Sequence, residues 1–291
     1  MKIEVLSPSG YCIGVAKAME IASKVRKDNP TKKVCVLGML VHNNDALKEL
    51  ESLDIKTIYH KEKSLIDLID EIEPDSIVVL TAHGHSKAIE EKLAKKGFEY
   101  IDATCPFVKN SFKEISDEIS SGHQVIYIGK KNHPESNAAL SLSKNVFLVE
   151  IDKPLDLSNI SDNSPLIISQ TTFSKYDVKE VIKSIKERIP NVRELNGICN
   201  ASSKRQEALL NGDVKADLVY VVGGVNSNNT KTLFKMAKSH YLNSKVIAIE
   251  NENDIKEKDL LGLSHIIISS GASTPSSVIS RIVSKLESLC D

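Results

Sequence analysis

The chain has 291 residues, 41% of them hydrophobic and 26% charged, a composition that supports two or three folded domains and excludes general disorder. Its 38 basic and 39 acidic residues give a net charge of −1, which excludes a global field that attracts nucleic acid or an anionic membrane. No apolar run approaches the roughly 18–20 residues of a membrane-spanning helix and no signal peptide is recognisable, so we expect a cytoplasmic protein.

Six short, β-branched apolar runs are spread along the chain and predict buried β-strands. In chain order they occupy residues 33–41, 76–82, 124–129, 165–169, 218–222 and 265–270. In the same order, the polar side chains at or just beyond their ends include His42, His83, His133, Thr172, Ser227 and Ser273. Amphipathic segments between the runs predict helices, as at residues 46–53, 87–97 and 178–189.

Three of the five cysteines recur at nearly constant spacing. Cys12, Cys105 and Cys199 are separated by 93 and 94 residues, and each ends an extended segment and precedes a helix-like one. At such a junction the helix N-terminus lowers the pKa of a thiol and suits a thiolate ligand. Cys35 lies inside an apolar run and is interpreted as a buried hydrophobic residue, and Cys290 as an exposed thiol in the tail.

Strands that alternate with helices in this way are typical of parallel sheets covered on both faces. We therefore predict an α/β protein of three pseudo-equivalent domains over residues 1–103, 104–196 and 197–291. Ligands bind beyond the carboxyl ends of parallel strands, so convergence of these ends would bring the cysteines and polar clusters into one central cavity. The alternative is three independent domains with the cysteines far apart.

Three thiolates leave two kinds of metal centre open. Zinc would need a fourth ligand, and structural zinc sites usually draw on local C-x₂₋₄-C pairs, which this sequence lacks. In an iron–sulfur cubane, three cysteines would leave one iron open to act as a Lewis acid on a substrate.

The polar side chains at the strand ends favour an anionic substrate. Hydroxyls, amides, imidazoles and helix N-termini can hold phosphate without a dedicated lysine; here these donors are His42, His83, His133, Ser227, Asn229 and Ser273. Each taken alone also fits a plain turn or a structural histidine. In N-H-P-E, His133 and Glu135 flank Pro134 and can deliver protons in a partly desolvated site, or can mark only the start of a helix.

Nine motifs then occur in order across nearly the whole chain. They are Y-C-I-G-V, V-H-N, T-A-H-G-H-S, D-A-T-C-P, N-H-P-E, Q-T-T-F-S, I-C-N-A-S-S-K-R-Q-E-A, G-G-V-N-S-N-N-T and S-G-A-S-T-P. With them the sequence closely resembles the LytB/IspH family of 4-hydroxy-3-methylbut-2-enyl diphosphate reductases, which catalyse the last step of the non-mevalonate isoprenoid pathway.

The resemblance implies a cloverleaf of three domains around one 4Fe-4S cluster, held by Cys12, Cys105 and Cys199 with one iron left open. It implies reductive removal of the allylic hydroxyl of the substrate, giving isopentenyl and dimethylallyl diphosphate, with electrons from a reduced flavodoxin or ferredoxin. Glu135 would then donate the proton, with Thr172 at the hydroxyl and His133 in the proton relay. The implied diphosphate ligands are His42, His83, Ser227, Asn229 and Ser273.

The chain departs from the usual motifs of the family in three places. N-S-N-N stands where N-S-S-N is common, so Asn228 replaces a serine and its contact with the diphosphate is in doubt. S-S-G-A-S stands for T-A-G-A-S, and Ser202 stands for a threonine. None of these changes removes a predicted cluster ligand or the predicted proton donor.

Two other functions remain as alternatives. A 4Fe-4S hydro-lyase would use the same open iron to expel a hydroxyl without external electrons, and a carboxylate substrate would favour it. A zinc or iron–sulfur regulatory protein would bind metal without turnover.

Overall fold

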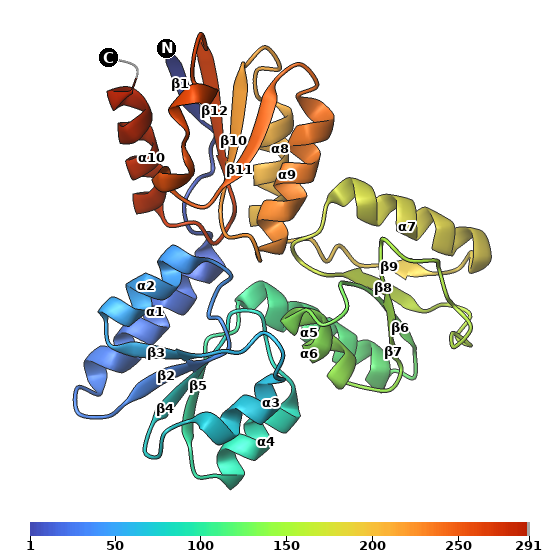
Figure 1. The fold of residues 1–291 in the computed structure, drawn as a ribbon. Helices are drawn as coiled ribbons and strands as arrows, with labels where there is room; N and C mark the ends of the chain where they lie inside the picture. The colour runs from blue at the N-terminus through green and yellow to red at the C-terminus, as the bar shows by residue number, and fades with distance from the viewer. Residues whose placement is uncertain (290–291) are drawn as a thin grey trace. The chain divides into compact units, whose positions relative to one another are not determined.

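The computed structural model describes residues 1–289, and the chain divides into two compact units. The first unit combines residues 1–16, residues 41–49 and the segment from Asn200 onward; the second combines residues 17–40 and 50–199. The described strands form three four-stranded sheets, one in the first unit and two in the second, and all their pairings are parallel (Figure 1).

The sheet of the first unit contains, in spatial order, β1 (Lys2–Val5), β12 (His265–Ser270), β10 (Leu218–Val222) and β11 (Lys245–Ile249). The helical segments that lie wholly within this unit are α8 (Asn200–Leu210), α9 (Asn228–His240), η2 (Glu252–Asp254), η3 (Glu257–Asp259) and α10 (Ser276–Ser288). Two further helices, α1 (Ile13–Asp28) and α2 (Asn44–Ser52), begin in the first unit and end in the second.

Both faces of this sheet are covered. Tyr220 and Val222 of β10 pack in an apolar cluster with side chains of α10, whereas Val219 and Val221 pack on the other face with side chains of α8 and α9. This alternation follows from the period of two of a β-strand. Covered faces explain why β10 is apolar at every position.

The second unit contains two sheets of the same construction. One runs β3 (Ile55–Ile58), β2 (Val34–Leu37), β4 (Ile77–Leu80) and β5 (Glu99–Asp102). The other runs β7 (Val146–Val149), β6 (Val125–Ile128), β8 (Leu166–Ser169) and β9 (Arg193–Glu194). The helices that lie wholly in this unit are α3 (Leu65–Leu68), η1 (Ile69–Glu71), α4 (Lys87–Lys95), α5 (Pro106–Ser120), α6 (Pro134–Ser141) and α7 (Lys175–Arg188).

The three sheets repeat one strand order. A partly exposed edge strand (β3, β7 or β11) is followed across the sheet by two buried strands and then by a fourth strand (β5, β9 or β1). Each fourth strand is followed in the chain by one of the evenly spaced cysteines, which are Cys105, Cys199 and Cys12. The cysteine repeat in the sequence therefore reflects a repeat of the fold.

The predicted α/β class and all six predicted strands are confirmed, as β2, β4, β6, β8, β10 and β12. The extended segments before the cysteines are β1, β5 and β9. We did not predict β3, β7 and β11. Sheet membership also differs from the predicted allocation, because β1 lies with the strands of residues 197–291 and not with those of residues 1–103. The exact domain boundaries and the cloverleaf stay predictions.

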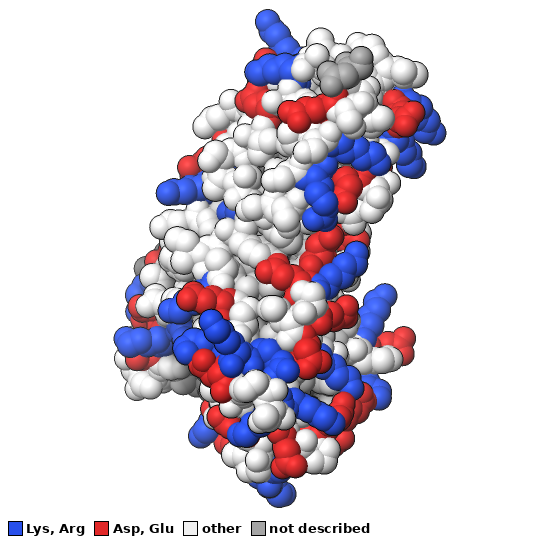
Figure 2. Space-filling view, turned by 90° about the vertical axis from the view of Figure 1, so that its left-hand side faces the viewer, with Lys and Arg blue, Asp and Glu red and all other residues white. Residues whose placement is uncertain are grey.

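The described helices include none that is long and apolar enough to cross a membrane. Basic and acidic side chains are interspersed on the face that Figure 2 shows, where neither sign forms a large continuous area. This surface agrees with the near-zero net charge of the sequence.

Candidate functional site

Helix α6 places the predicted proton donor. His133 is its N-cap, Pro134 occupies its first turn, and the His133 Nδ1 atom accepts a hydrogen bond from the Glu135 backbone N–H at 3.2 Å. Proline suits this position because its fixed φ is helical and its missing N–H is not needed there. The N-H-P-E segment is therefore the start of a helix, and this start buries Glu135 to an exposed fraction of 1%.

The Glu135 carboxyl group accepts three hydrogen bonds. The Thr171 backbone N–H and the Tyr127 hydroxyl donate to Oε1 at 2.9 and 3.1 Å, and the Thr171 hydroxyl donates to Oε2 at 2.9 Å. Thr171 follows β8, and Tyr127 lies within β6. Two neighbouring strands of one sheet thus fix a carboxyl group that a helix carries.

Burial raises the pKa of Glu135 to about 7, although the hydrogen bonds from Thr171 and Tyr127 act in the opposite direction. Desolvation disfavours the charged carboxylate, whereas donated hydrogen bonds favour it. A carboxyl group with a pKa near neutrality can give up or take a proton at neutral pH, as a general acid requires.

Thr172 follows Thr171 in the loop after β8. The Gln170 Nε2 atom donates to the Thr172 hydroxyl at 3.1 Å, and the Gln170 Oε1 atom accepts from the Ser136 hydroxyl and the Lys130 backbone N–H. Gln170 is fully buried, so its amide group has a fixed orientation. It links α6 to the Thr172 side chain.

Two histidines of the second unit meet. The rings of His83, which follows β4, and His133 have centroids 5.6 Å apart and an interplanar angle of 74°. The Cys105 backbone N–H, at the N-cap of α5, donates to the Ala82 carbonyl at 3.0 Å. Cys105 and His83 are thereby held on neighbouring strand ends.

Cys199 is connected to the loop that carries the proton-donor contacts. Its backbone N–H donates to the Thr171 carbonyl at 3.2 Å, and α8 begins one residue later. The second unit therefore joins the predicted site residues that it contains into one connected set, which is His83, Cys105, His133, Glu135, Thr172 and Cys199.

The remaining predicted site residues lie in the first unit. The Cys12 backbone N–H donates to the Ala272 carbonyl at 2.9 Å, and the next residue, Ser273, donates from its hydroxyl to the His42 carbonyl at 3.4 Å. A Cβ atom on Gly224 would lie 2.4 Å from the same His42 carbonyl oxygen, so only glycine permits this approach.

The start of α9 organises the polar residues of the first unit. Ser227 is the N-cap, and its hydroxyl accepts from the Thr230 backbone N–H at 3.3 Å. The buried Asn229 amide accepts from the Ala272 N–H at 2.9 Å and donates to the Ser202 hydroxyl at 3.2 Å. Asn228 is the first helical residue, and its predicted contact with a diphosphate stays a prediction.

His42 has a depressed pKa. Burial, and secondarily the positive charge of Lys231, lower the pKa of His42 to about 4. The imidazole is therefore neutral at pH 7, with one N–H to donate and one nitrogen to accept. A neutral donor can hold a phosphate oxygen without forming an ion pair.

The three evenly spaced cysteines have the chemistry that a thiolate-bound metal centre requires. Each is half-buried, and the four cysteines within residues 1–289 form no disulfide with one another. The Val15 backbone N–H donates to the Cys12 sulfur at 3.4 Å, a bond that favours the thiolate form. Cys35 differs, since it is buried in β2, which confirms its interpretation as a buried hydrophobic residue. Burial raises the pKa of its thiol to about 12. Cys290 lies outside the described residues.

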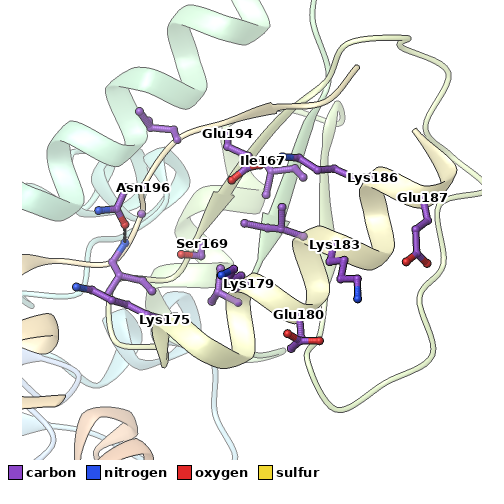
Figure 3. Close-up of a pocket in the computed structure, with 15 residues that line it drawn as sticks. Ile167, Ser169, Lys175, Lys179, Glu180, Lys183, Lys186, Glu187, Glu194 and Asn196 are labelled. Carbon is purple, nitrogen blue, oxygen red and sulfur yellow. Dashed lines mark hydrogen bonds and ion pairs between the residues drawn. The ribbon is translucent and has the colours of Figure 1, made fainter. Parts of the chain in front are cut away.

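A separate groove of about 980 Å³ runs along α7 in the second unit (Figure 3). Its apolar lining includes Ile167 and Val178, and Lys175, Lys179 and Lys183 lie along its helical side. Ile198 is part of its lining, but none of the described residues that line the groove is a predicted site residue.

Sequence reasoning missed four residues that support the site, namely Tyr127, Gln170, Thr171 and Arg205. Gln170 and Thr171 sit in the same motif as Thr172, so the abrupt Q-T-T after a buried strand was the available signal. Tyr127 gave no signal, because an aromatic residue inside an apolar run is normally core.

A family model described as LytB protein matches residues 3–287. The curated 4-hydroxy-3-methylbut-2-enyl diphosphate reductase of Malacoplasma penetrans is 34% identical, and the match spans 99% of this chain and 97% of that protein. The curated enzyme of the same name from Bacillus thuringiensis is 35% identical, and the match spans 99% of this chain and 90% of that protein.

Two solved structures have the same fold. One, the E-1-hydroxy-2-methyl-but-2-enyl-4-diphosphate reductase from Plasmodium falciparum, is 26% identical, has a TM-score of 0.85, and matches over 97% of this chain and 87% of its own. The other, an (E)-4-hydroxy-3-methyl-but-2-enyl diphosphate reductase described as the terminal enzyme of the non-mevalonate pathway, is 29% identical with a TM-score of 0.70, over 99% and 100% of the two chains. The chain described here therefore belongs to the LytB protein family.

Proposed function

We propose that this protein is a 4-hydroxy-3-methylbut-2-enyl diphosphate reductase. The reaction removes the allylic hydroxyl as water, consumes two electrons and two protons, and gives isopentenyl and dimethylallyl diphosphate. Full-length relatives with this name support the activity. The observation that carries the proposal is the buried Glu135 carboxyl of α6, whose pKa of about 7 suits a proton donor. It accepts a hydrogen bond from the Thr171 N–H, and the Thr171 carbonyl accepts one from the Cys199 N–H.

Membership of the LytB family implies an iron–sulfur cofactor. Cys12, Cys105 and Cys199 would hold one 4Fe-4S cluster and leave one iron without a cysteine ligand. Their positions at helix N-termini support this assignment, because helix N–H groups stabilise thiolates. Such a cluster would supply electrons, and Lewis acidity at the open iron.

The substrate diphosphate would be held by neutral donors. The proposed donors of the first unit are His42, Ser227, Asn228, Asn229 and Ser273, of which the two asparagines stand at the start of α9. The proposed donor of the second unit is His83. The low pKa of His42 supports this role, since a neutral imidazole donates one hydrogen bond and carries no charge. The reaction does not alter the diphosphate group, so contacts to it would serve to orient the hydroxyl end.

Proton delivery would depend on Glu135. The protonated carboxyl gives its proton to the leaving hydroxyl, and the carboxylate that remains is stabilised by the donors from Thr171 and Tyr127. Thr172 would position the substrate hydroxyl, with its own side chain fixed by Gln170. His133 would take part in the relay from the N-cap position.

We further propose that the two electrons arrive singly from a reduced flavodoxin or ferredoxin, and that the enzyme acts in the cytoplasm. Both proposals follow from the family resemblance.

The deciding experiment is the anaerobic oxidation of reduced methyl viologen with and without 4-hydroxy-3-methylbut-2-enyl diphosphate. We expect substrate-dependent oxidation by the wild type and a loss of about 10²–10⁴-fold in Glu135→Gln, the range for removal of a general acid. Glu187→Gln, which changes an exposed residue of α7, is the matched control and should keep full activity.

The outcome separates the alternatives. A hydro-lyase would convert its substrate without oxidising viologen, and a regulatory protein would bind iron and turn over nothing. Full activity of Glu135→Gln would remove Glu135 from the mechanism and leave the reductase assignment intact.

A further inference from the structure

Tyr127 is a buried residue of the second unit whose only polar atom on the side chain meets the proposed proton donor. Its exposed fraction is 0%, and its hydroxyl oxygen lies 3.1 Å from the Glu135 Oε1 atom. The ring is otherwise part of an apolar cluster with Ile115 of α5 and Ala139 of α6. A phenylalanine would fill this space equally well, so packing alone does not explain the hydroxyl.

The backbone leaves room for this ring. A Cβ atom on Gly129, two residues further along the chain, would lie 2.6 and 2.8 Å from two carbon atoms of the Tyr127 ring. The same Cβ would lie 2.5 Å from the Ser136 hydroxyl oxygen. Contacts this short do not occur, so glycine at position 129 is what allows the phenol to reach the carboxyl group.

We propose that Tyr127 is a positioning residue for Glu135: its hydroxyl orients the carboxyl group and stabilises the carboxylate that remains after the proton has left. This inference rests on the proposed role of Glu135 as proton donor. Thr171 provides the other two donors, but Tyr127 reaches the carboxyl from a different strand, β6. The two strands together leave the carboxyl group little freedom to rotate.

The protonation states fit this arrangement. Burial, and then the charge of Glu135, raise the pKa of Tyr127 well above its usual value, so the phenol keeps its proton and acts as a donor. The titratable groups that face Glu135 are Tyr127 from β6 and His133 at the start of α6, and His83, after β4, packs against His133. Burial is the main cause of the raised pKa of Glu135, and no cation contributes to it.

Tyr127→Phe tests the inference, because it removes the hydroxyl and keeps the ring. Loss of a hydrogen bond to a charged group should raise the midpoint at which Glu135 ionises by about one to two pH units. The midpoint is measured from the infrared band of the protonated carboxyl, which is assigned by its absence in Glu135→Gln. The alkaline limb of the pH profile of kcat should move upward by the same amount.

Tyr220→Phe is the matched control. Tyr220 is a buried tyrosine at the equivalent strand β10, and its hydroxyl has no hydrogen-bond partner among the described residues. This variant should leave both the infrared midpoint and the pH profile unchanged. An unchanged Glu135 midpoint in Tyr127→Phe would overturn the inference.

A second substitution tests the same bond in the opposite direction. 3-Fluorotyrosine at position 127 keeps the ring and is a stronger donor, so it should lower the Glu135 midpoint. This arm decides the matter if Tyr127→Phe does not fold. The infrared titration needs no turnover, so a shifted midpoint in a protein without reductase activity would support the Tyr127–Glu135 bond and refute the proposed function instead.

Discussion

At the scale of single residues, the second unit contains carboxyl groups in opposite environments. Asp70 is exposed between Lys92 and Lys96, and hydrogen bonds from these lysines lower its pKa to about 2. Glu135 is buried among neutral donors, and burial raises its pKa to about 7. The first environment belongs to an ordinary surface ion pair, and the second is the kind that catalytic acids need.

The pH dependence of stability should reveal Glu135. Its pKa is raised from 4.5 in the unfolded chain to about 7 in the fold, so the unfolded state releases this proton first as the pH rises. The contribution of Glu135 to the free energy of unfolding of the second unit is therefore fully present below about pH 4.5. It decreases by roughly 3 kcal/mol between that pH and pH 7.

Urea denaturation followed by far-ultraviolet circular dichroism measures this effect, because the chain has no tryptophan. We expect Glu135→Gln to flatten the pH dependence between pH 4.5 and 7. If the free energy of unfolding depended on pH equally in this variant and in the wild type, the raised pKa of Glu135 would be contradicted.

The cysteines give a second prediction at this scale. Each single replacement of Cys12, Cys105 or Cys199 by serine should remove most of the iron from anaerobically purified protein, because a thiolate ligand is lost. Cys35→Ala is the control, since Cys35 is a buried strand residue. Iron content per chain and the visible absorption spectrum measure the result, and equal iron loss in all four variants would discredit the ligand assignment.

Some residues of the candidate site could be predicted from the sequence and others could not. Glu135 was predicted from the N-H-P-E segment and the family resemblance, and the role of Thr172 was implied by the family resemblance alone. Thr171 and Tyr127, which hold Glu135, were not predicted, because a hydrogen bond between residues 36 or 8 positions apart leaves no pattern in the sequence. Supporting contacts are a property of the fold.

At the scale of secondary-structure elements, the three edge strands were missed for a common reason. In β3 and β7 the two middle residues are exposed or partly buried, and in β11 only the last residue is buried. Strands with this burial pattern need not be continuous apolar runs, and the sequence therefore marks them less clearly. The inner strands β2, β4, β6, β8 and β10 are buried at every residue. Sequence patterns report burial on both faces more clearly than strand pairing.

Helix α8 shows how one buried side chain can join several elements of the first unit. The Arg205 guanidinium donates to the Gly10 carbonyl at 2.6 Å, the Ser270 carbonyl at 3.2 Å and the Ala201 carbonyl at 3.3 Å. Gly10 precedes Cys12, and Ser270 ends β12. Arg205, with an exposed fraction of 3%, therefore connects the loop before Cys12 to the end of β12 in the sheet of the first unit.

We predict that Arg205→Met destabilises the first unit by about 3 kcal/mol, because buried carbonyl oxygens lose their donors. The control is Arg188→Met, at an exposed arginine of α7 that donates to the Leu155 carbonyl, and it should cost less than about 1 kcal/mol. Urea denaturation measures both. Equal stability of the two variants would show that the Arg205 bonds are replaced by water.

At the scale of the whole molecule, the N-terminal strand is added to a sheet built otherwise from the end of the chain. Lys2 lies opposite His265 and Val5 opposite Ile268 in the parallel pairing of β1 with β12 (Figure 1). Leu6 continues this contact, since its N–H donates to the Ile268 carbonyl at 2.9 Å and its side chain is buried.

Deletion of residues 1–6 should therefore destabilise the first unit, by at least about 2 kcal/mol from the lost burial of Leu6 and the lost strand pairing. Hydrogen exchange tests the location of the effect. Amides of β12 should exchange faster, while those of β4 and β8 in the second unit should not change. A uniform change across both units would argue against β1 as a local element of one sheet.

The sequence by itself determined the α/β class, the buried strands, the cysteine repeat and the residues that carry the family resemblance. These are recorded locally, in apolar runs, in their polar ends and in motifs of a few residues. Only the tertiary structure decided that β1 closes the C-terminal sheet, that Arg205 ties the loop before Cys12 to β12, and that Tyr127 and Thr171 hold Glu135. The physical reason is that strand pairing and burial set these contacts, and neither depends on proximity along the chain.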